Sequence, residues 1–251
     1  MTINLIKDSN IYNKYSFSIN DFKNATFETL KISLPITCNK MSSVIIQSIS
    51  SIIIPSRLIL ANMTYSQALK TYGIINGMVI PFIYLPFSIS SALVVNLIPS
   101  ISKEMALKNN KSLLNKIVFS LGLTLFIGVC CSLFFYFFGI ELCTLVFKNE
   151  TAGRYLKAMF LTPIFLSLNQ TLSAILHSIR KEFISSFNTI FTMVIQFILL
   201  YFLLPIPSLN IYAYIYVTTI MAAVTTLLHT MELVFSIKNL INKECLNELF
   251  K

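Results

Sequence analysis

Long apolar stretches separated by short polar ones form the main pattern along this chain. Each stretch is close to the roughly 20 residues that an α-helix needs to cross the hydrocarbon core of a membrane. Strands of a membrane barrel would instead be short and would alternate apolar with polar residues. We therefore predict an all-α, polytopic membrane protein whose six spans lie at about residues 32–54, 72–99, 117–139, 158–177, 183–204 and 211–235.

Prolines and turns divide the apolar stretches. Residues 183–231 contain no Asp, Glu, Lys or Arg and are too long for one span, and the Pro-rich turn at 205–210 splits them. Pro81 and Pro86 interrupt the second span and are predicted hinges, because helices in transporters often bend at such positions around a cavity. The predicted regions are a cytoplasmic N-terminal segment at 1–30, a transmembrane bundle at 31–237 and a cytoplasmic tail at 238–251.

The composition agrees with a membrane protein. Of 251 residues, 55% are hydrophobic and 12% are charged, whereas an ordinary soluble domain has about 25% charged residues. This balance excludes a soluble globular domain and a disordered chain. The net charge of +9 would suggest nucleic acid in a soluble protein. Cytoplasmic loops of membrane proteins also collect Lys and Arg, so we expect the lipid bilayer, and no nucleic acid, as a partner.

The positions of the basic residues predict the orientation. With the N-terminus inside, thirteen of the 19 Lys and Arg residues fall in inner segments and five in outer loops. The remaining one, Lys40, lies within the first span. Because basic residues gather on the cytoplasmic side, we expect a multi-pass protein of the cytoplasmic membrane with both termini cytoplasmic.

Lys40 is the most informative single residue. It lies about nine residues, or roughly 13 Å, inside the first span. A charge at that depth is costly, so it normally faces a polar cavity or a partner. Ser43 and Gln47 share its helix face at i+3 and i+7. This stripe predicts a cavity surface that meets an anionic group of a substrate, although Lys40 could also extend its side chain to the membrane surface.

Three further polar residues within spans are candidates for lining the same cavity. Asn76, Asn96 and Asn169 could contact a substrate, but each could equally join helices by hydrogen bonds. The chain has no GxSxG with a partnered His, no HExxH and no phosphate-binding glycine loop, so we expect no enzyme and no catalytic residue. The five cysteines form no CxxC pair, and no metal or cofactor is expected.

The two histidines, His177 and His229, lie near the predicted cytoplasmic ends of two spans. A histidine in such a place usually packs between helices or lies at the membrane interface. His229 and Glu232 are three residues apart on one helix face, which leaves a proton-linked pair open. Glu141 and Glu232 are both near span ends, so no carboxylate is expected deep in the membrane.

The first two spans carry a spaced set of proline and glycine motifs. They are LPIT at 34–37 leading to Lys40, IIIPSRL at 52–58, YG at 72–73, Gly77, Pro81, Pro86 and LIPSISKE at 97–104. These motifs resemble the opening of the C-terminal half of the stage V sporulation protein B family. The later spans fit that family in number and length but carry no sharp motif.

The resemblance implies a member of the multidrug/oligosaccharidyl-lipid/polysaccharide exporter superfamily. It implies a flippase for a lipid-linked oligosaccharide such as lipid II, acting in spore cortex peptidoglycan synthesis or polysaccharide export. Members of the family alternate the access of a cavity between two six-helix lobes, where basic residues meet the lipid pyrophosphate. Lys40 stands where relatives usually show Arg, so it keeps the positive charge but loses bidentate geometry.

The length of the chain limits this resemblance. Family members are about twice as long, and this chain resembles only their second lobe. We therefore expect a six-helix bundle like one lobe of a two-lobe flippase, either pairing with a separate N-terminal six-helix lobe or present as a fragment with partial or no activity. Two alternatives stay open: a multidrug or cation antiporter of the same superfamily, and a non-transporting membrane scaffold subunit.

Overall fold

The computed structural model describes the backbone of residues 19–107 and 109–249. These residues form helices and turns, and no strand occurs among them. The first eighteen residues of the predicted N-terminal segment and the last two of the predicted tail lie outside the described residues. The elements are α1 (Ile19–Leu60), α2 (Tyr65–Ile74), η2 (Ile75–Val79, a π-helix), α3 (Ile80–Ala106), α4 (Asn110–Phe147), α5 (Glu150–Ala158), α6 (Thr162–Ser178), α7 (Glu182–Leu203) and α8 (Ile211–Leu249).

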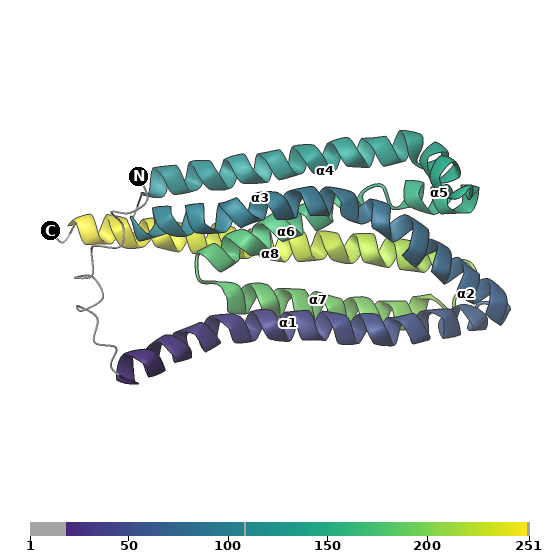
Figure 1. Ribbon diagram of the computed structural model, residues 1–251, viewed down its shortest axis with the longest axis horizontal. Helices are drawn as coiled ribbons and strands as arrows, with labels where there is room; N and C mark the ends of the chain where they lie inside the picture. The colour runs from purple at the N-terminus through teal and green to yellow at the C-terminus, as the bar shows by residue number, and fades with distance from the viewer. Residues whose placement is uncertain (1–18, 108, 250–251) are drawn as a thin grey trace, which may run out of the picture.

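The six long helices run along one axis of the molecule (Figure 1). Helix α1 packs along α7, while α6 lies at the centre of a second group and contacts α3, α4 and α8. Helix α2 joins the two groups at one end, and α7 also packs against α8. The start of α1 and the end of α8 lie at the same end of the bundle (Figure 1).

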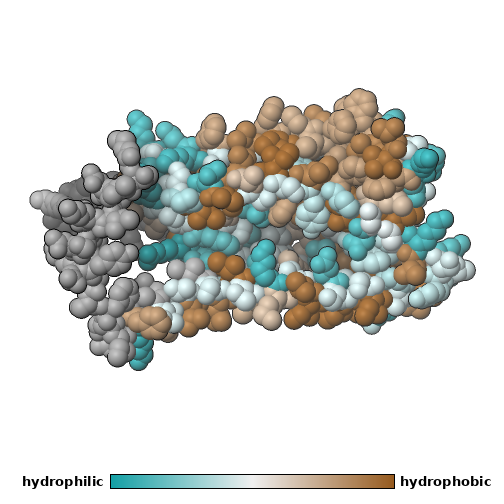
Figure 2. Space-filling view, in the orientation of Figure 1, coloured by the Kyte–Doolittle hydropathy of each residue, from teal (hydrophilic) through white to brown (hydrophobic). Residues whose placement is uncertain are grey.

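The helices have the length and surface of membrane spans. Five are long and apolar enough to cross a membrane, and the bent pair of α5 and α6 makes up to six. Phe126, Phe137 and Leu145 are exposed on α4, and Figure 2 shows apolar residues spread over that helix. Such a large exposed apolar surface is unusual for a soluble monomer and is the normal surface of a helix in lipid. The chain is an all-α, polytopic membrane protein.

Helices α5 and α6 form a bent pair. Their axes differ by 56° across a break of four residues or fewer. Pro163 lies in the first turn of α6, where a missing backbone N–H costs nothing. The predicted span at 158–177 falls across this bend, with most of its residues in α6.

Glycines allow α4 to touch its neighbours closely. A Cβ added at Gly153 of α5 would lie 2.5 Å from the Cα of Ile140 in α4, which is closer than packed atoms can approach. A Cβ at Gly128 of α4 would lie 3.0 Å from the Cα of Ile164 in α6. Glycine is needed at 153 because only a residue without a side chain lets two helix backbones approach this far, whereas at 128 a side chain would push α6 away slightly.

Candidate functional site

The polar stripe on α1 consists of Lys40, Ser43 and Gln47, and Lys40 is the basic residue predicted to lie inside the first span. Lys40 and Gln47 are exposed and Ser43 is half-buried. The hydroxyl of Ser43 donates a hydrogen bond to the Lys40 carbonyl oxygen at 2.8 Å, so its hydrogen is already used within α1. Three ion pairs occur among the described residues, and Lys40 takes part in none of them. The Lys40 ammonium is therefore available to an anion from outside the bundle. The helix that carries the stripe packs mainly on α7 and α2.

Asn76 and Asn96 lie elsewhere in the bundle. Asn76 is exposed within the π-turn η2, and Asn96 is exposed on α3. Helix α3 packs on α4 and α6, so it does not pack closely against the stripe on α1. The structure therefore does not bring these two asparagines into contact with Lys40.

Asn169 joins two helices. Its Nδ2 donates to the carbonyl oxygen of Ala222 at 3.1 Å, and its Oδ1 accepts from the hydroxyl of Thr226 at 3.0 Å. Both ends of the amide are thus bonded to α8 while the residue itself belongs to α6. This geometry matches the helix-joining alternative more directly than a substrate contact.

The predicted hinges follow a break in the α-helical hydrogen bonds. In η2 the N–H of Ile80 bonds to the carbonyl oxygen of Ile75, five residues earlier. Pro81 follows at once and has no N–H, and Pro86 is buried one turn later. Proline and a π-turn are both recognised causes of a bend, and the helix curves from α2 into α3 (Figure 1). The sequence located the prolines but contained no signal for the π-turn.

A second polar group, which the sequence did not single out as a site, connects α6, α7 and α8. The hydroxyl of Ser173 lies 3.0 Å from that of Ser185 and 3.4 Å from Nε2 of His177. His229 is 1% exposed, and its Nε2 lies 3.2 Å from the Ser185 carbonyl oxygen and 3.5 Å from the Thr189 hydroxyl. We call these five residues the histidine network. Two sequence signals pointed to it: both histidines lie near predicted cytoplasmic span ends, and residues 173 and 177, like 185 and 189, have i, i+4 spacing.

The carboxylate nearest to His229 in sequence has another partner. Glu232 lies 3.4 Å from the ammonium of Lys181 and accepts a bond from Ser236 at 3.0 Å. The Lys181–Glu232 pair therefore ties the loop between α6 and α7 to α8. Glu232 is held by this pair, which makes it an unsuitable proton partner for His229.

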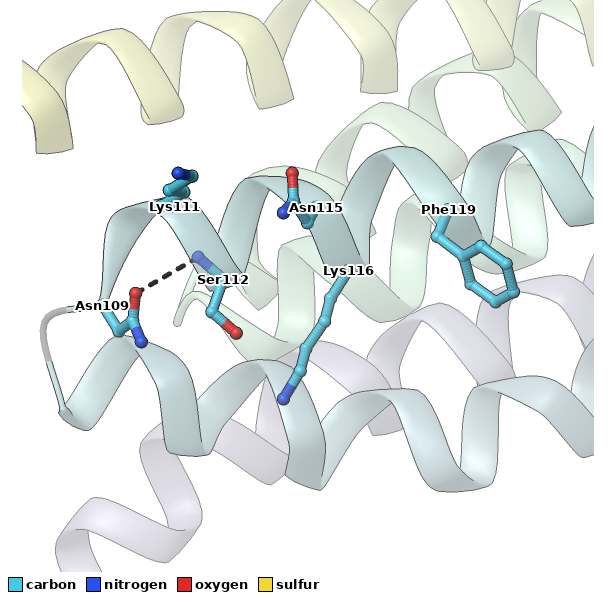
Figure 3. Close-up of a pocket in the computed structure, with 6 residues that line it drawn as sticks. All are labelled: Asn109, Lys111, Ser112, Asn115, Lys116 and Phe119. Atoms are coloured by element: carbon cyan, nitrogen blue, oxygen red, sulfur yellow. Dashed lines mark hydrogen bonds between the residues drawn. The ribbon is translucent and has the colours of Figure 1, made fainter.

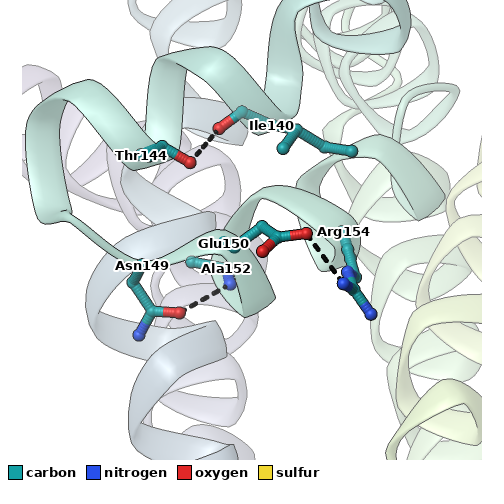
Figure 4. A network of polar contacts seen from close by, with 6 residues as sticks. All are labelled: Ile140, Thr144, Asn149, Glu150, Ala152 and Arg154. Carbon is teal, nitrogen blue, oxygen red and sulfur yellow. Dashed lines mark hydrogen bonds and ion pairs between the residues drawn. The ribbon is translucent and has the colours of Figure 1, made fainter.

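Polar contacts at the far end of the bundle shape a turn. Asn149 accepts a bond from the N–H of Ala152 at 3.1 Å and so caps α5, and Glu150 pairs with Arg154 at 2.7 Å (Figure 4). The Glu150–Arg154 pair is exposed, and surface pairs of this kind contribute about 0–1 kcal/mol. These contacts set where α5 begins and offer no site.

A hollow of about 430 Å³ lies at the start of α4. Its lining includes Lys111 and Asn115, while Asn109 caps the helix through the N–H of Ser112 (Figure 3). Lys116 also lines it but is paired with Glu104 at 2.6 Å. The hollow is open and is lined by one helix end, so it is separate from the α1 stripe. In the described part of the chain, no group of His, Cys, Asp and Glu could hold a metal ion.

Comparisons with known proteins show what the chain is similar to. No protein-family model matches the chain. Stage V sporulation protein B of Bacillus subtilis (strain 168) is 24% identical over 214 residues, covering 84% of this chain and 41% of that protein. The chain is thus similar to stage V sporulation protein B over most of its length. Sporulation protein YkvU of the same organism is 27% identical over 137 residues, covering 55% of this chain and 30% of that protein.

A solved structure shares the fold. The crystal structure of MATE in the straight conformation matches with a TM-score of 0.66 and 16% identity, over 90% of this chain and 49% of that chain. The resemblance to stage V sporulation protein B found in the motifs is thus confirmed by sequence, and the helix arrangement is that of part of a MATE structure. The chain spans less than half the length of the curated relatives it matches.

Proposed function

We propose that this chain is one lobe of a flippase of the stage V sporulation protein B type. It moves a lipid-linked oligosaccharide, such as lipid II, across the bacterial cytoplasmic membrane by alternating access, for spore cortex peptidoglycan or polysaccharide export. Both termini face the cytoplasm. The relationship to stage V sporulation protein B and the shared fold with a MATE structure support a transporter of this superfamily.

Lys40 is the observation that carries the proposal. It is an exposed cation on a candidate membrane span, and it takes part in none of the ion pairs among the described residues. A charge within a membrane span is costly unless it meets water or an opposite charge. The diphosphate of a lipid-linked sugar supplies that opposite charge, while Ser43 and Gln47 offer hydrogen bonds along the same face.

The proposal includes a second six-helix lobe. The matched MATE chain is about twice as long as the part that this bundle covers. The stripe on α1 lies on an exposed face, so a partner lobe placed against it would enclose Lys40 in a cavity between the two. In the bundle alone the stripe is exposed and not enclosed in a cavity, so we expect the bundle alone to be inactive or weakly active in transport.

A flipping assay tests the proposal. The chain is reconstituted in liposomes alone and together with a separately expressed N-terminal six-helix lobe, and translocation of a fluorescent lipid-linked saccharide is measured. We expect transport only with both lobes, a loss of at least about tenfold for Lys40→Ala, and substantial retention for Lys40→Arg. Lys70→Ala, an exposed lysine on α2, is the matched control.

Other outcomes would replace the proposal. Transport by Lys40→Ala at the wild-type rate would remove Lys40 from the mechanism. Movement of an organic cation, with no movement of the lipid, would indicate the multidrug or cation antiporter. A stable complex of the two lobes that moves neither would indicate a membrane scaffold.

A further inference from the structure

Apolar packing joins the α1–α7 pair to the rest of the bundle at one end only. At the α2 and α5 end, α1 and α7 share one buried core with the other helices, to which they contribute Leu58 and Leu200. A second buried core surrounds the end of α6 that carries the histidine network. In the described part of the chain its members come from α3, α4, α6, α8 and the loop after α6, and none comes from α1 or α7. The apolar cores therefore hold the pair at the α2 and α5 end and not at the histidine-network end.

Polar contacts take the place of an apolar core where α7 meets α8 near the histidine network. The contacting residues of α7 repeat at steps of four, three and four, so they lie along one face of the helix. In the middle of this line the Thr192 hydroxyl lies 2.9 Å from that of Thr225. We call the line the polar seam; its members are Ser185, Thr189, Thr192 and Gln196 on α7 and His229, Thr225 and Thr218 on α8.

Hydroxyls of the polar seam have a second partner on their own helix. The Thr225 hydroxyl can donate to the Met221 carbonyl oxygen at 2.8 Å, and that of Thr192 to the Asn188 carbonyl oxygen at 3.0 Å. A hydroxyl has one hydrogen, which can pass from the neighbouring helix to its own backbone. Parting α7 from α8 along the seam therefore leaves these hydroxyls bonded, whereas parting an apolar core exposes surface to water without compensation.

Two buried polar atoms at the seam lack a protein partner while the helices are packed. Nε2 of His229 lies 3.2 Å from the Ser185 carbonyl oxygen, which can only accept, so Nε2 carries the hydrogen and Nδ1 is a bare acceptor. This Nδ1 and the hydroxyl of Ser186, the residue after Ser185, are buried without a hydrogen-bond partner among the described residues. Buried polar atoms are nearly always paired, so both atoms would gain hydrogen bonds from water that entered the seam.

One ion pair closes the seam at the histidine-network end. The ammonium of Lys181, in the loop before α7, lies 3.4 Å from the carboxylate of Glu232 on α8. A partly exposed ion pair stabilises a contact only modestly, so this pair can hold the seam closed and still release it. The contact from α6 to α7 at this level is also polar, between the hydroxyls of Ser173 and Ser185 at 3.0 Å.

We propose that the α1–α7 pair swings away from α8 at the histidine-network end and pivots on the apolar core at the α2 and α5 end. In the open state the Lys181–Glu232 pair is broken, and water from that side of the membrane enters the polar seam as far as Thr192. The three-residue loop between α6 and α7 limits how far the helices part. The motion belongs to the bundle itself and does not rest on the proposed function.

Cysteine labelling in lipid nanodiscs tests the motion. The five native cysteines are first replaced by serine or alanine. A water-soluble maleimide should then label Thr192→Cys at least about tenfold faster than Leu200→Cys or Thr171→Cys. Leu200 is also buried but belongs to the apolar core. Thr171 is the matched hydroxyl control, because its contact with Thr124 at 2.9 Å joins α6 to α4 within the group that stays packed.

Spin labels measure the motion without altering the seam. Phe187 and Leu227 are exposed on α7 and α8 near the histidine network, and labels on cysteines at these two positions should give two distances. Labels at Phe202 and Tyr212, toward the α2 and α5 end of the same helices, should give one. Pulsed electron paramagnetic resonance on the two doubly labelled chains supplies both distance distributions.

Charge variants test the ion pair. Lys181→Glu places two carboxylates together at Glu232 and should raise the labelling rate of Thr192→Cys about two- to fivefold. Combining Lys181→Glu with Glu232→Lys restores opposite charges and should bring the rate back. A rate that ignores both changes would remove the ion pair from the proposal.

The motion is overturned if Thr192→Cys labels no faster than Leu200→Cys. Equal labelling of all three cysteines would also overturn it, since that result means a general loosening of the bundle. A single distance between positions 187 and 227 would do the same. Transport that ignores Lys40→Ala would instead contradict the proposed function alone, so the two ideas fail in different experiments.

Discussion

Single residues in this bundle have separable roles, although several look alike in sequence. Lys40 is an exposed cation outside the described ion pairs, whereas Lys116 and Lys181 are committed to Glu104 and Glu232. Asn169 is bonded at both ends of its amide, whereas Asn96 is exposed. The surroundings of each side chain, and not its type, decide whether its polar atoms are bonded within the bundle or left exposed.

Asn169 provides a test of this distinction. Asn169→Ala removes bonds to the Ala222 carbonyl oxygen and to Thr226. Hydrogen bonds between membrane helices contribute about 0.6 kcal/mol on average and up to about 1.7 kcal/mol, so we expect the free energy of unfolding in detergent to fall by about that range. Asn96→Ala, on an exposed position, should leave it nearly unchanged. Equal losses for the two variants would contradict the helix-joining role.

Among the helices, close approach and bending position the site. Helix α5 crosses the end of α4 because Gly153 admits the backbone at Ile140. The π-turn η2 and the prolines that follow bend α2 into α3, which lets one continuous segment leave the α1 side and join the α6 group. Helix α6 also reaches α7, where the hydroxyl of Ser173 lies 3.0 Å from that of Ser185.

Gly153 offers a sharp prediction for the contact between α4 and α5. In Gly153→Ala the new methyl group would lie 2.5 Å from the Ile140 Cα, so the helices must separate. Overpacking of this kind typically costs about 1–3 kcal/mol, which a thermal melt in detergent measures. Gly122→Ala is the matched control, because nothing lies within 4 Å of its added Cβ. A melting temperature unchanged by Gly153→Ala would show that α5 is not held against α4.

The whole molecule has its first and last described helix ends on one side (Figure 1). With the basic residues concentrated in the inner segments, both ends are expected in the cytoplasm. The α1–α7 pair and the group around α6 then form the body of one lobe. The exposed apolar surface of α4 faces lipid.

Reporter fusions check this orientation. A fluorescent protein that folds only in the cytoplasm should be active when fused at residue 109 or at the C-terminus, and inactive when fused at residue 62 or residue 149. The loops at 62 and 149 lie at the α2 and α5 end of the bundle (Figure 1). The reversed pattern would contradict the orientation and would place the histidine network near the outer surface.

Much of the fold followed from hydropathy, because a helix that crosses lipid must be long and apolar whatever its neighbours are. Hydropathy says little about how a helix is rotated against its neighbours. The histidine network was therefore not predicted: His177, Ser185 and His229 belong to three different helices and come together only when α6, α7 and α8 pack. The break between α5 and α6 was also missed, since a short amphipathic helix such as α5 adds no apolar run.

Which residues line a cavity stays a prediction. Lys40 stood out because a lone charge inside an apolar run has few explanations. Asn76, Asn96 and Asn169 could not be told apart, since contact and exposure depend on the partner helix. The structure distinguishes Asn169 by its two bonds to α8.

The shared side of the two helix ends in Figure 1 bears on how such proteins evolve. A bundle that enters and leaves on the same face of a membrane can be fused to a second bundle of the same kind, or separated from it, without turning either one over. Gene fusion and gene splitting therefore conserve the orientation of every helix.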